Sequence, residues 1–423
     1  MNIDQDKAIA ALFSSRRLLD IMDVLNGRGE ETRVVGGAVR NALIGLSTGD
    51  VDLATTALPE TVIARARAGG FKPVPTGIEH GTVTVVVRGR PFEVTTLRRD
   101  IATDGRHATV CFGRDFDEDA RRRDFTVNAL SVSADRVLHD PVGGMADLKD
   151  GRIRFIGEPA ERIREDYLRI LRFFRFHAAY GEGPLDRAGL DAAIAEREGL
   201  AVLSAERIRA EIMKLVITRR AGEIAQEISD AGFFERIFGG VAYPVLFARL
   251  TEIGRTAGDA VLRLGALAVA IPEDADRLRA RLRLSNAEHK RLTGMADARI
   301  AWHNREAVPD RQDLQARLFL AGRIAAGDAL ALTHAASGAS PDDPDWLAAA
   351  EFIADAPEPR LPVSGDDVIA SGRVRGRLVG AALKSLQARW IRAGFPKEPA
   401  IVARLLDDVL SELAPASPAE TPR

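Results

Sequence analysis

The feature that most constrains the fold is a change in sequence pattern near residue 150. Before it, short β-branched runs such as VDLATT and GTVTVVV alternate with turn residues, which predicts strands. After it, long segments rich in Ala, Leu and Arg repeat their apolar residues with helical spacing almost to the end of the chain. This order predicts an α+β fold, with a small mixed-sheet head followed by an all-helical neck, body and tail.

The length of 423 residues, of which 46% are hydrophobic, exceeds what one hydrophobic core usually serves. We predict four parts: a head over 1–150, a helical neck over 151–215, a helical body over 216–355, and a helical tail over 356–423 with disordered last residues. Residues 1–30 are predicted to form one amphipathic helix. Ser285 and Glu288 have the spacing of a capping box, which predicts a helix start there.

Charge and cysteine content narrow the class of protein. The net charge is −2, so any site for a polyanion must be a local patch. One cysteine excludes a disulfide framework and a Cys-based zinc site, which fits a reducing compartment. The first residues combine acids with helical periodicity, unlike a signal peptide, and no apolar run approaches about 18 residues. We therefore expect a cytoplasmic protein without a membrane span.

The stretch GGAVRNALIGLSTGDVDL carries the first chemical signal. Asp50 and Asp52 are two residues apart, so on a strand their side chains project from one face. Neighbouring carboxylates repel each other unless a cation lies between them, and hard oxygen ligands suit Mg²⁺. The Gly-Gly turn allows a close approach to a phosphate, which Arg40 in the following helix could also contact.

Each of these features also has an ordinary explanation, because Gly-Gly turns and exposed Asp-x-Asp loops arise by chance. Glu93 adds weight, since Phe92 and Val94 point away from it in a strand-like run. An isolated acid there is either part of an exposed face or a third ligand. Two Asp on one strand and a Glu on its neighbour would form a two-metal site for phosphoryl transfer.

At this point the sequence from about 33 to 215 resembles the class II tRNA nucleotidyltransferase/poly(A) polymerase family. The resemblance implies a catalytic head, a neck that recognises the nucleotide base, and an RNA-binding body and tail. One departure is Asn41, where relatives usually have Asp, and we expect little effect from it. The resemblance rests on these motifs in order: VVGGAVRNALIG with GDVDL, HGTVTVVV, FEVTTLRRD, RRRDFTVNAL, DPVGGMADLKDGRIRFIG, REDYLRILRFFRF and SAERIRAEIMKL.

The resemblance also implies roles for individual residues. Asp50 and Asp52 would bind the catalytic Mg²⁺, and Glu93 would complete the catalytic carboxylate set. The positions that match nucleotide-binding residues of the family are Gly37, Arg40, Arg123, Asn128, Asp166, Arg169, Arg172 and Arg175.

The segment EDYLRILRFFR has two interpretations. Glu165 and Arg169 have the i,i+4 spacing of an ordinary helical salt bridge. Alternatively, Asp166 and Arg169 read the base, because a carboxylate beside a guanidinium complements the amino group and ring nitrogen of cytosine and adenine. In a continuous helix Arg175 lies about half a turn from Asp166, so these residues cannot share one face with Arg172, which we expect near the phosphates.

Two further segments resemble those of enzymes that add the whole CCA end. They are a loop over 95–112 and a basic tail in which Arg373, Arg375 and Arg377 either bind RNA or form a solvated face. The implied activity is attack of the tRNA 3′ end on CTP and then ATP, with release of pyrophosphate. The alternatives are a poly(A) polymerase, a partial CC- or A-adding enzyme, and a non-catalytic RNA-binding protein. Either a monomer or a homodimer is compatible with the sequence.

Overall fold

The computed structural model describes residues 4–104 and 107–413, which form two compact units. Unit 1 comprises Met1–Val241 and Arg281–Arg283, and unit 2 comprises Ala242–Ala280 and Leu284–Arg423. The mixed sheet lies in unit 1, and no strand follows residue 139 in the described chain, so the predicted α+β class is confirmed. The four-part division stays a prediction, and the terminus predicted to be disordered, 414–423, lies outside the described residues.

The sheet of unit 1 has the strand order β3-β4-β5-β2-β1-β8-β9. Strands β2 and β5 run parallel and the other neighbours run antiparallel, so the sheet is mixed. A separate ladder joins β6 to β7. The strands are β1 Thr32–Val35, β2 Asp52–Thr55, β3 Lys72–Gly77, β4 Thr82–Val87, β5 Arg90–Thr96, β6 Arg98–Asp104, β7 His107–Phe112, β8 Ser131–Ser133 and β9 Leu138–His139.

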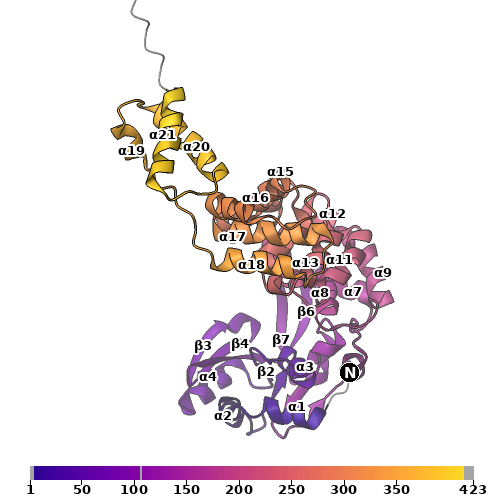
Figure 1. Ribbon diagram of the computed structural model, residues 1–423. Helices are drawn as coiled ribbons and strands as arrows, with labels where there is room; N and C mark the ends of the chain where they lie inside the picture. Colours follow the sequence, from indigo (N-terminus) through magenta and orange to yellow (C-terminus); the bar gives the residue numbers. More distant parts are fainter. Residues whose placement is uncertain (1–3, 105–106, 414–423) are drawn as a thin grey trace, which may run out of the picture. The chain divides into compact units, whose positions relative to one another are not determined.

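Helix α4 packs against β3 and β4, and α2 packs against α4, β1 and β4 (Figure 1). The single N-terminal helix predicted over 1–30 is wrong, because the chain forms two helices separated at Ser14 and Ser15. The Ser14 hydroxyl donates to the Ala11 carbonyl (2.7 Å), and Ser15 has an extended backbone as the N-cap of α2. Serine favours such positions because its side chain competes with helical hydrogen bonds. The helices are α1 Gln5–Leu12, α2 Arg16–Leu25, α3 Gly37–Leu43, α4 Pro59–Ala68, α5 Phe116–Arg121 and α6 Gly144–Asp150.

A buried aromatic cluster fixes helix α8 to the sheet-containing part of unit 1. Phe125 lies 4.9 Å from Phe155 and 5.2 Å from Phe176 between ring centroids, and Phe155 lies 5.4 Å from Phe173. Such aromatic pairs add about 0.5–1.5 kcal/mol each to the gain from burial. Helix α8 is therefore a firm support for side chains that face the sheet. The helices here are α7 Pro159–Glu165, α8 Leu168–Tyr180, α9 Arg187–Ala195, α10 Ala205–Leu215, α11 Ala221–Asp230 and α12 Phe233–Phe238.

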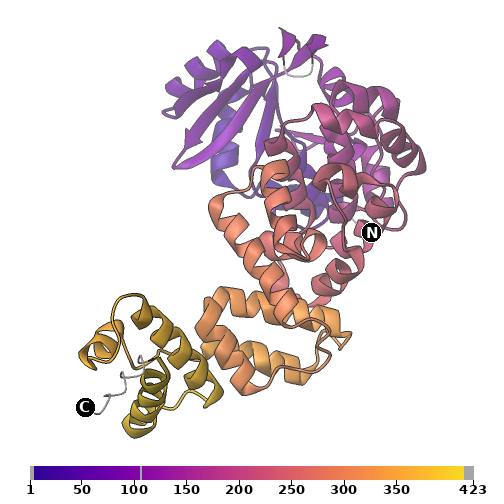
Figure 2. The same ribbon diagram turned by 90° about the horizontal axis from the view of Figure 1, so that it is seen from above.

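Unit 2 is helical (Figure 2). Its last three helices pack through a core that includes Val368, Leu386 and Val409. The capping box predicted at Ser285 and Glu288 is confirmed at the start of α16. No helix within the described ranges is long and apolar enough to cross a membrane. The helices are α13 Pro244–Glu252, α14 Ala260–Ala268, α15 Pro272–Leu282, α16 Asn286–Ala301, α17 Arg311–Ser337, α18 Pro344–Asp355, α19 Gly365–Ala370, α20 Arg377–Arg392 and α21 Pro399–Leu413.

A charged network holds three helices of unit 2 together. Arg291 of α16 donates to Asp328 of α17 at 2.8 Å and 2.7 Å, and to Asp259, the N-cap of α14, at 3.0 Å and 2.5 Å. Burial raises the pKa of Asp328, while the hydrogen bond and the positive charge of Arg291 act to lower it. Asp328 is 5% exposed, so loss of Arg291 would leave a buried carboxylate without its partner.

We predict that Arg291→Met lowers the free energy of unfolding of the protein by about 2–3 kcal/mol, below the 3–5 kcal/mol typical of a fully buried pair because Arg291 is partly exposed. Chemical denaturation monitored by circular dichroism measures this change. Lys290→Met provides the control, because Lys290 is exposed on the same helix. Equal stability of the two variants would contradict the structural importance of the network.

Candidate active site

The predicted site begins where β1 turns into α3. Strand β1 ends at Val35 rather than continuing through VVGGAV, because Gly36 has φ 68° and ψ −128°, a conformation that favours glycine. A Cβ at Gly36 would also lie 3.0 Å from the Arg123 guanidinium. The turn therefore places the Gly-Gly backbone and Arg123 side by side.

Strand pairing brings the predicted carboxylates to one region of the sheet. Asp52 is the first residue of β2 and lies opposite Glu93 of β5 in the parallel pair. The spacing predicted that Asp50 is on the same strand as Asp52, but Asp50 lies in the bend before β2. Asp50 and Asp52 are nevertheless both exposed while Val51 between them is buried, as expected for an extended segment. The predicted orientation of Glu93 away from Phe92 and Val94 is confirmed, since those two side chains are buried.

The electrostatics of Asp52 reflect these neighbours. Partial burial raises the pKa of Asp52, and Glu93 and Asp50 raise it further, while Arg123 lowers it. Within the described residues, no three acidic, His or Cys side chains lie close enough to count as a ready-made metal cluster. The donor set nevertheless fits a hard divalent cation, because its oxygens are carboxylates and a cation would offset their mutual repulsion.

A cavity of about 470 Å³ joins the glycine turn to the helices that follow the head. A neighbouring cavity of about 280 Å³ contains Asp52 and Glu93, and shares Arg122 and Arg123 with the first. Of the residues predicted to act on a nucleotide, Gly37, Arg40, Asp52, Arg123, Asn128, Asp166, Arg169 and Arg172 line the larger of the two. We name this larger cavity the nucleotide cavity.

Arg40 is a buried part of the wall of the nucleotide cavity. It donates to the Asn128 side chain and to the Asn41 side-chain oxygen (2.8 Å). Its guanidinium also lies 3.8 Å from the centroid of the Tyr180 ring, a cation–π geometry. The departure Asn41 thus orients Arg40, and it does so without adding a negative charge beside the cavity.

The joint between α7 and α8 holds the predicted base-reading pair. Asp166 follows the end of α7 with an extended backbone (φ −156°, ψ 104°), so the predicted continuous helix is interrupted there. Arg169 forms the i,i+4 salt bridge with Glu165 at 2.5 Å and donates to the Arg162 carbonyl at 2.7 Å. The salt-bridge interpretation therefore describes a real contact, yet Asp166 and Arg169 both line the nucleotide cavity.

The two remaining arginines of α8 have different partners, although the predicted half-turn between Arg175 and Asp166 assumed a continuous helix that the structure does not have. Arg172 lines the nucleotide cavity and pairs with Asp124 at 2.5 Å. Burial alone would raise the pKa of Asp124, but Arg172 and hydrogen bonds from Asn128 and the Phe125 amide lower it. Among the described residues Arg175 does not line the nucleotide cavity, and it pairs with Glu211 at 2.5 Å.

Sequence reasoning did not assign four residues of this region. Asp124 pairs with Arg172, and Asp119 accepts a hydrogen bond from Arg123 at 3.1 Å. The other two, Arg122 and Arg207, line the nucleotide cavity. Three of them lie in the motifs RRRDFTVNAL and SAERIRAEIMKL, so the signal was present. Their functions could not be separated from ordinary surface charge without the contacts.

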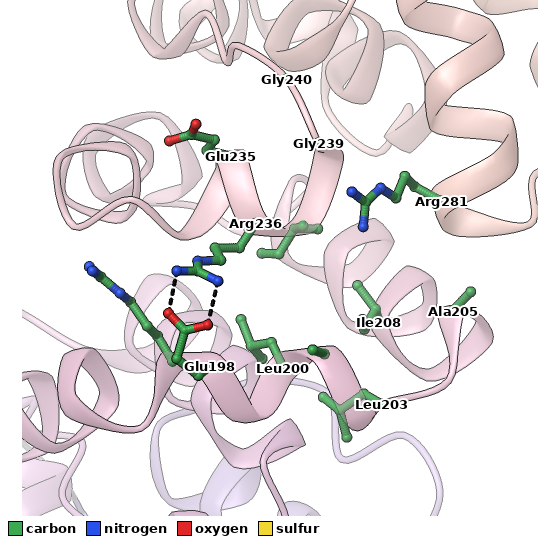
Figure 3. Close-up of a pocket in the computed structure, with 13 residues that line it drawn as sticks. Glu198, Leu200, Leu203, Ala205, Ile208, Glu235, Arg236, Gly239, Gly240 and Arg281 are labelled. Atoms are coloured by element: carbon green, nitrogen blue, oxygen red, sulfur yellow. Dashed lines mark hydrogen bonds and ion pairs between the residues drawn. The ribbon is translucent and has the colours of Figure 1, made fainter.

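A larger cavity of about 590 Å³ lies elsewhere in unit 1 (Figure 3). There Arg236 forms an ion pair with Glu198, and Arg281 extends toward Gly239. None of the predicted catalytic or nucleotide-binding residues lines this cavity. Its volume is therefore a poor guide to the chemistry of the protein.

Comparisons with known proteins agree with this geometry. Residues 32–154 match the Poly A polymerase head domain family. The chain is 31% identical over 404 residues to the mouse mitochondrial CCA tRNA nucleotidyltransferase 1, covering 93% of this chain and 90% of the relative. It is 31% identical over 385 residues to the CCA-adding enzyme of Limosilactobacillus fermentum, covering 86% and 90%. The fold and site thus define a nucleotidyltransferase.

A solved structure extends the likeness to nearly the whole fold. The Bacillus stearothermophilus CCA-adding enzyme in complex with CTP is 27% identical with a TM-score of 0.73, covering 94% of this chain and 98% of the other. The chain belongs to the CCA tRNA nucleotidyltransferase family. Membership of a nucleotidyltransferase family implies use of a divalent metal ion.

Proposed function

We propose that this protein adds the sequence CCA to the 3′ end of tRNA, using CTP twice and then ATP. One observation carries the proposal. Asp52 and Glu93 line one cavity of unit 1, and the predicted base-reading pair Asp166 and Arg169 lines the adjoining nucleotide cavity. The names of relatives that match almost the full chain support the same activity. We also propose Mg²⁺ as the metal and a cytoplasmic location, as the sequence predicts.

In the proposed reaction, the tRNA 3′ oxygen bonds to the α-phosphate of the nucleotide as the bond to the β-phosphate breaks. The hydroxyl proton passes to solvent water, and pyrophosphate leaves with the electron pair of the broken bond. Asp50 and Asp52 would hold the metal, with Glu93 completing the carboxylate set. When bound, the metal would supply charge stabilisation for the phosphoryl group and the leaving pyrophosphate. Arg123 and Arg172 line the nucleotide cavity, where their guanidinium groups suit contacts with phosphate oxygens.

Base choice would come from Asp166 and Arg169, which line the same nucleotide cavity. Asp166 accepts a hydrogen bond from the amino group of cytosine or adenine, and Arg169 donates to the adjacent ring nitrogen. Uracil and guanine present the opposite order, so an acceptor would face an acceptor and a donor would face a donor. The protein itself would therefore act as the template.

The function is tested with tRNA substrates that end before CC, after the first C and after CC, each incubated with one labelled NTP. We expect C on the first two substrates and A on the third. Extended A tracts on any substrate would favour the poly(A) polymerase alternative. Binding of tRNA without any transfer would favour the non-catalytic alternative.

The basic tail provides a separate test of tRNA binding. Arg375 and Arg377 are exposed, and the described part of the chain gives them no ion pair, whereas Arg373 pairs with Asp407 at 2.5 Å. We predict that Arg375→Ala combined with Arg377→Ala weakens tRNA binding and lowers its log–log salt slope by up to about two units. Filter binding at several salt concentrations measures this, with Arg373→Ala as the paired-arginine comparison. An unchanged slope would assign the tail to a solvated face.

A further inference from the structure

Both carboxylate oxygens of Asp166 are already held in the structure. Oδ1 accepts from the Leu168 amide at 3.1 Å, within the joint between α7 and α8. Oδ2 accepts from Nη2 of Arg207 at 2.7 Å, a charge-assisted hydrogen bond. One donor is two residues away in the chain and the other is 41 residues away. Together the two hydrogen bonds fix the plane in which the carboxylate presents its remaining lone pairs.

Arg207 is well placed to act on Asp166 from outside the joint. It belongs to the first turn of α10 and lines the nucleotide cavity together with Asp166 and Arg169. Its side chain is 34% exposed and that of Asp166 is 29% exposed, so water screens the pair only partly. Helix α10 packs against α8, where the Arg175–Glu211 ion pair reinforces the contact.

Arg169 has a corresponding support of its own. Glu165 and the Arg162 carbonyl hold its guanidinium. Its backbone amide donates to the Asp166 carbonyl at 2.9 Å, but among the described residues no hydrogen bond or ion pair joins the two side chains. The two base-reading groups are therefore oriented separately, one by α10 and the other by α7. This arrangement leaves the edge between them available to a base.

We infer that Arg207 is a positioning residue for nucleotide choice, which acts through the Asp166 carboxylate; the inference rests on the proposed function. With Arg207 present, Asp166 offers an acceptor in one orientation to the amino group of cytosine or adenine. Without it, only the Leu168 amide restrains the carboxylate, which can then rotate. A rotated carboxylate loses the bond to the correct base and no longer opposes uracil or guanine as strongly.

Arg207→Met tests the inference, because methionine keeps much of the apolar stem but removes the guanidinium. Single-turnover incorporation of all four NTPs on tRNA lacking CCA gives the ratio of CTP to UTP rates. We expect this ratio to fall roughly tenfold, the order expected from loss of one hydrogen bond to a charged group. Arg207→Lys keeps the charge but not the planar fork, so we expect an intermediate ratio.

Arg164→Met is the matched control. Arg164 of the neighbouring helix α7 pairs with Glu196 at 2.5 Å and is absent from the lining of the nucleotide cavity in the described chain. This variant should keep the wild-type ratio. The inference is overturned if Arg207→Met keeps the wild-type ratio, slows all four NTPs equally, or changes the ratio no more than Arg164→Met does.

Thermal melting establishes that each variant is folded before its ratio is compared. If Arg207→Met does not fold, Arg207→Lys decides the question, and a wild-type ratio in that variant overturns the inference. The wild-type protein in the same assay separates the two claims. A wild type that does not prefer CTP over UTP refutes the proposed function, whereas failure of the variants alone refutes only the assignment of Arg207.

Discussion

Replacement of Asp52 by Ala is expected to lower the rate of nucleotide addition by about a thousandfold or more. Asp52 lies opposite Glu93 in the sheet and lines both cavities of the site, together with Arg122 and Arg123. Loss of a carboxylate that holds a catalytic metal costs several kcal/mol of transition-state stabilisation, and each ~1.4 kcal/mol is tenfold in rate. Single-turnover kinetics with tRNA lacking CCA measures the effect.

Affinity for tRNA should change little in the same variant, because the proposed RNA contacts of Arg375 and Arg377 lie in unit 2. Filter binding checks this point. Asp23→Ala is a suitable control, since Asp23 is an exposed acid of α2 that does not line either cavity of the site. Near wild-type turnover of Asp52→Ala would show that the carboxylate assignment is incorrect. Asp50→Ala should change turnover in the same direction as Asp52→Ala.

The second large effect concerns Asp166 and Arg169. If they read the base, Asp166→Ala and Arg169→Ala should each slow CTP and ATP use and narrow the gap to UTP and GTP. A good bidentate base contact provides ~1–3 kcal/mol of discrimination, which corresponds to roughly five- to 150-fold. The measurement is the set of four single-turnover rates for each variant and the wild type.

The competing explanation is a purely structural salt bridge. Arg169→Ala would then cost about 1 kcal/mol of stability, since Arg169 also donates to the Arg162 carbonyl, and nucleotide choice would not change. Glu165→Gln helps to separate the two, because it weakens the i,i+4 pair while the Arg162 carbonyl still holds the Arg169 guanidinium. If Arg169 reads the base, the nucleotide ratios should change less in Glu165→Gln than in Arg169→Ala. Folded variants of Asp166 and Arg169 that keep the wild-type ratios among the four nucleotides would contradict base reading.

The sequence predicted β1, β2, β4 and β5, because β-branched runs and turn residues are local signals. It did not predict β3, β8 or β9, and the loop predicted over 95–112 is wrong, because the structure has the β6–β7 ladder there. The sequence also predicted the orientation of Glu93, since alternation along a strand is set by geometry. It did not predict the break of the N-terminal helix at Ser14 and Ser15, where apolar periodicity continues across the join. Periodicity alone carries no information about a short interruption of this kind, which here covers the three residues between Leu12 and Arg16.

The candidate site was predictable to a different extent. The motif spacing and family resemblance identified most of the residues that line the nucleotide cavity. They did not identify Arg207, because its partner Asp166 is 41 positions away in the chain. For the same reason the sequence could not distinguish Arg373, which is paired with Asp407, from Arg375 and Arg377. Long-range ion pairs decide which arginines remain available, and one sequence does not reveal them.

The most direct test of the central claim uses the wild-type protein, tRNA lacking CCA, and all four NTPs together at equal concentrations. Sequencing of the product 3′ ends shows both which bases are chosen and how many are added. The account predicts that most extended molecules end in CCA, with little U or G. Products that carry U or G as often as C and A, or that are extended by A alone, would contradict it.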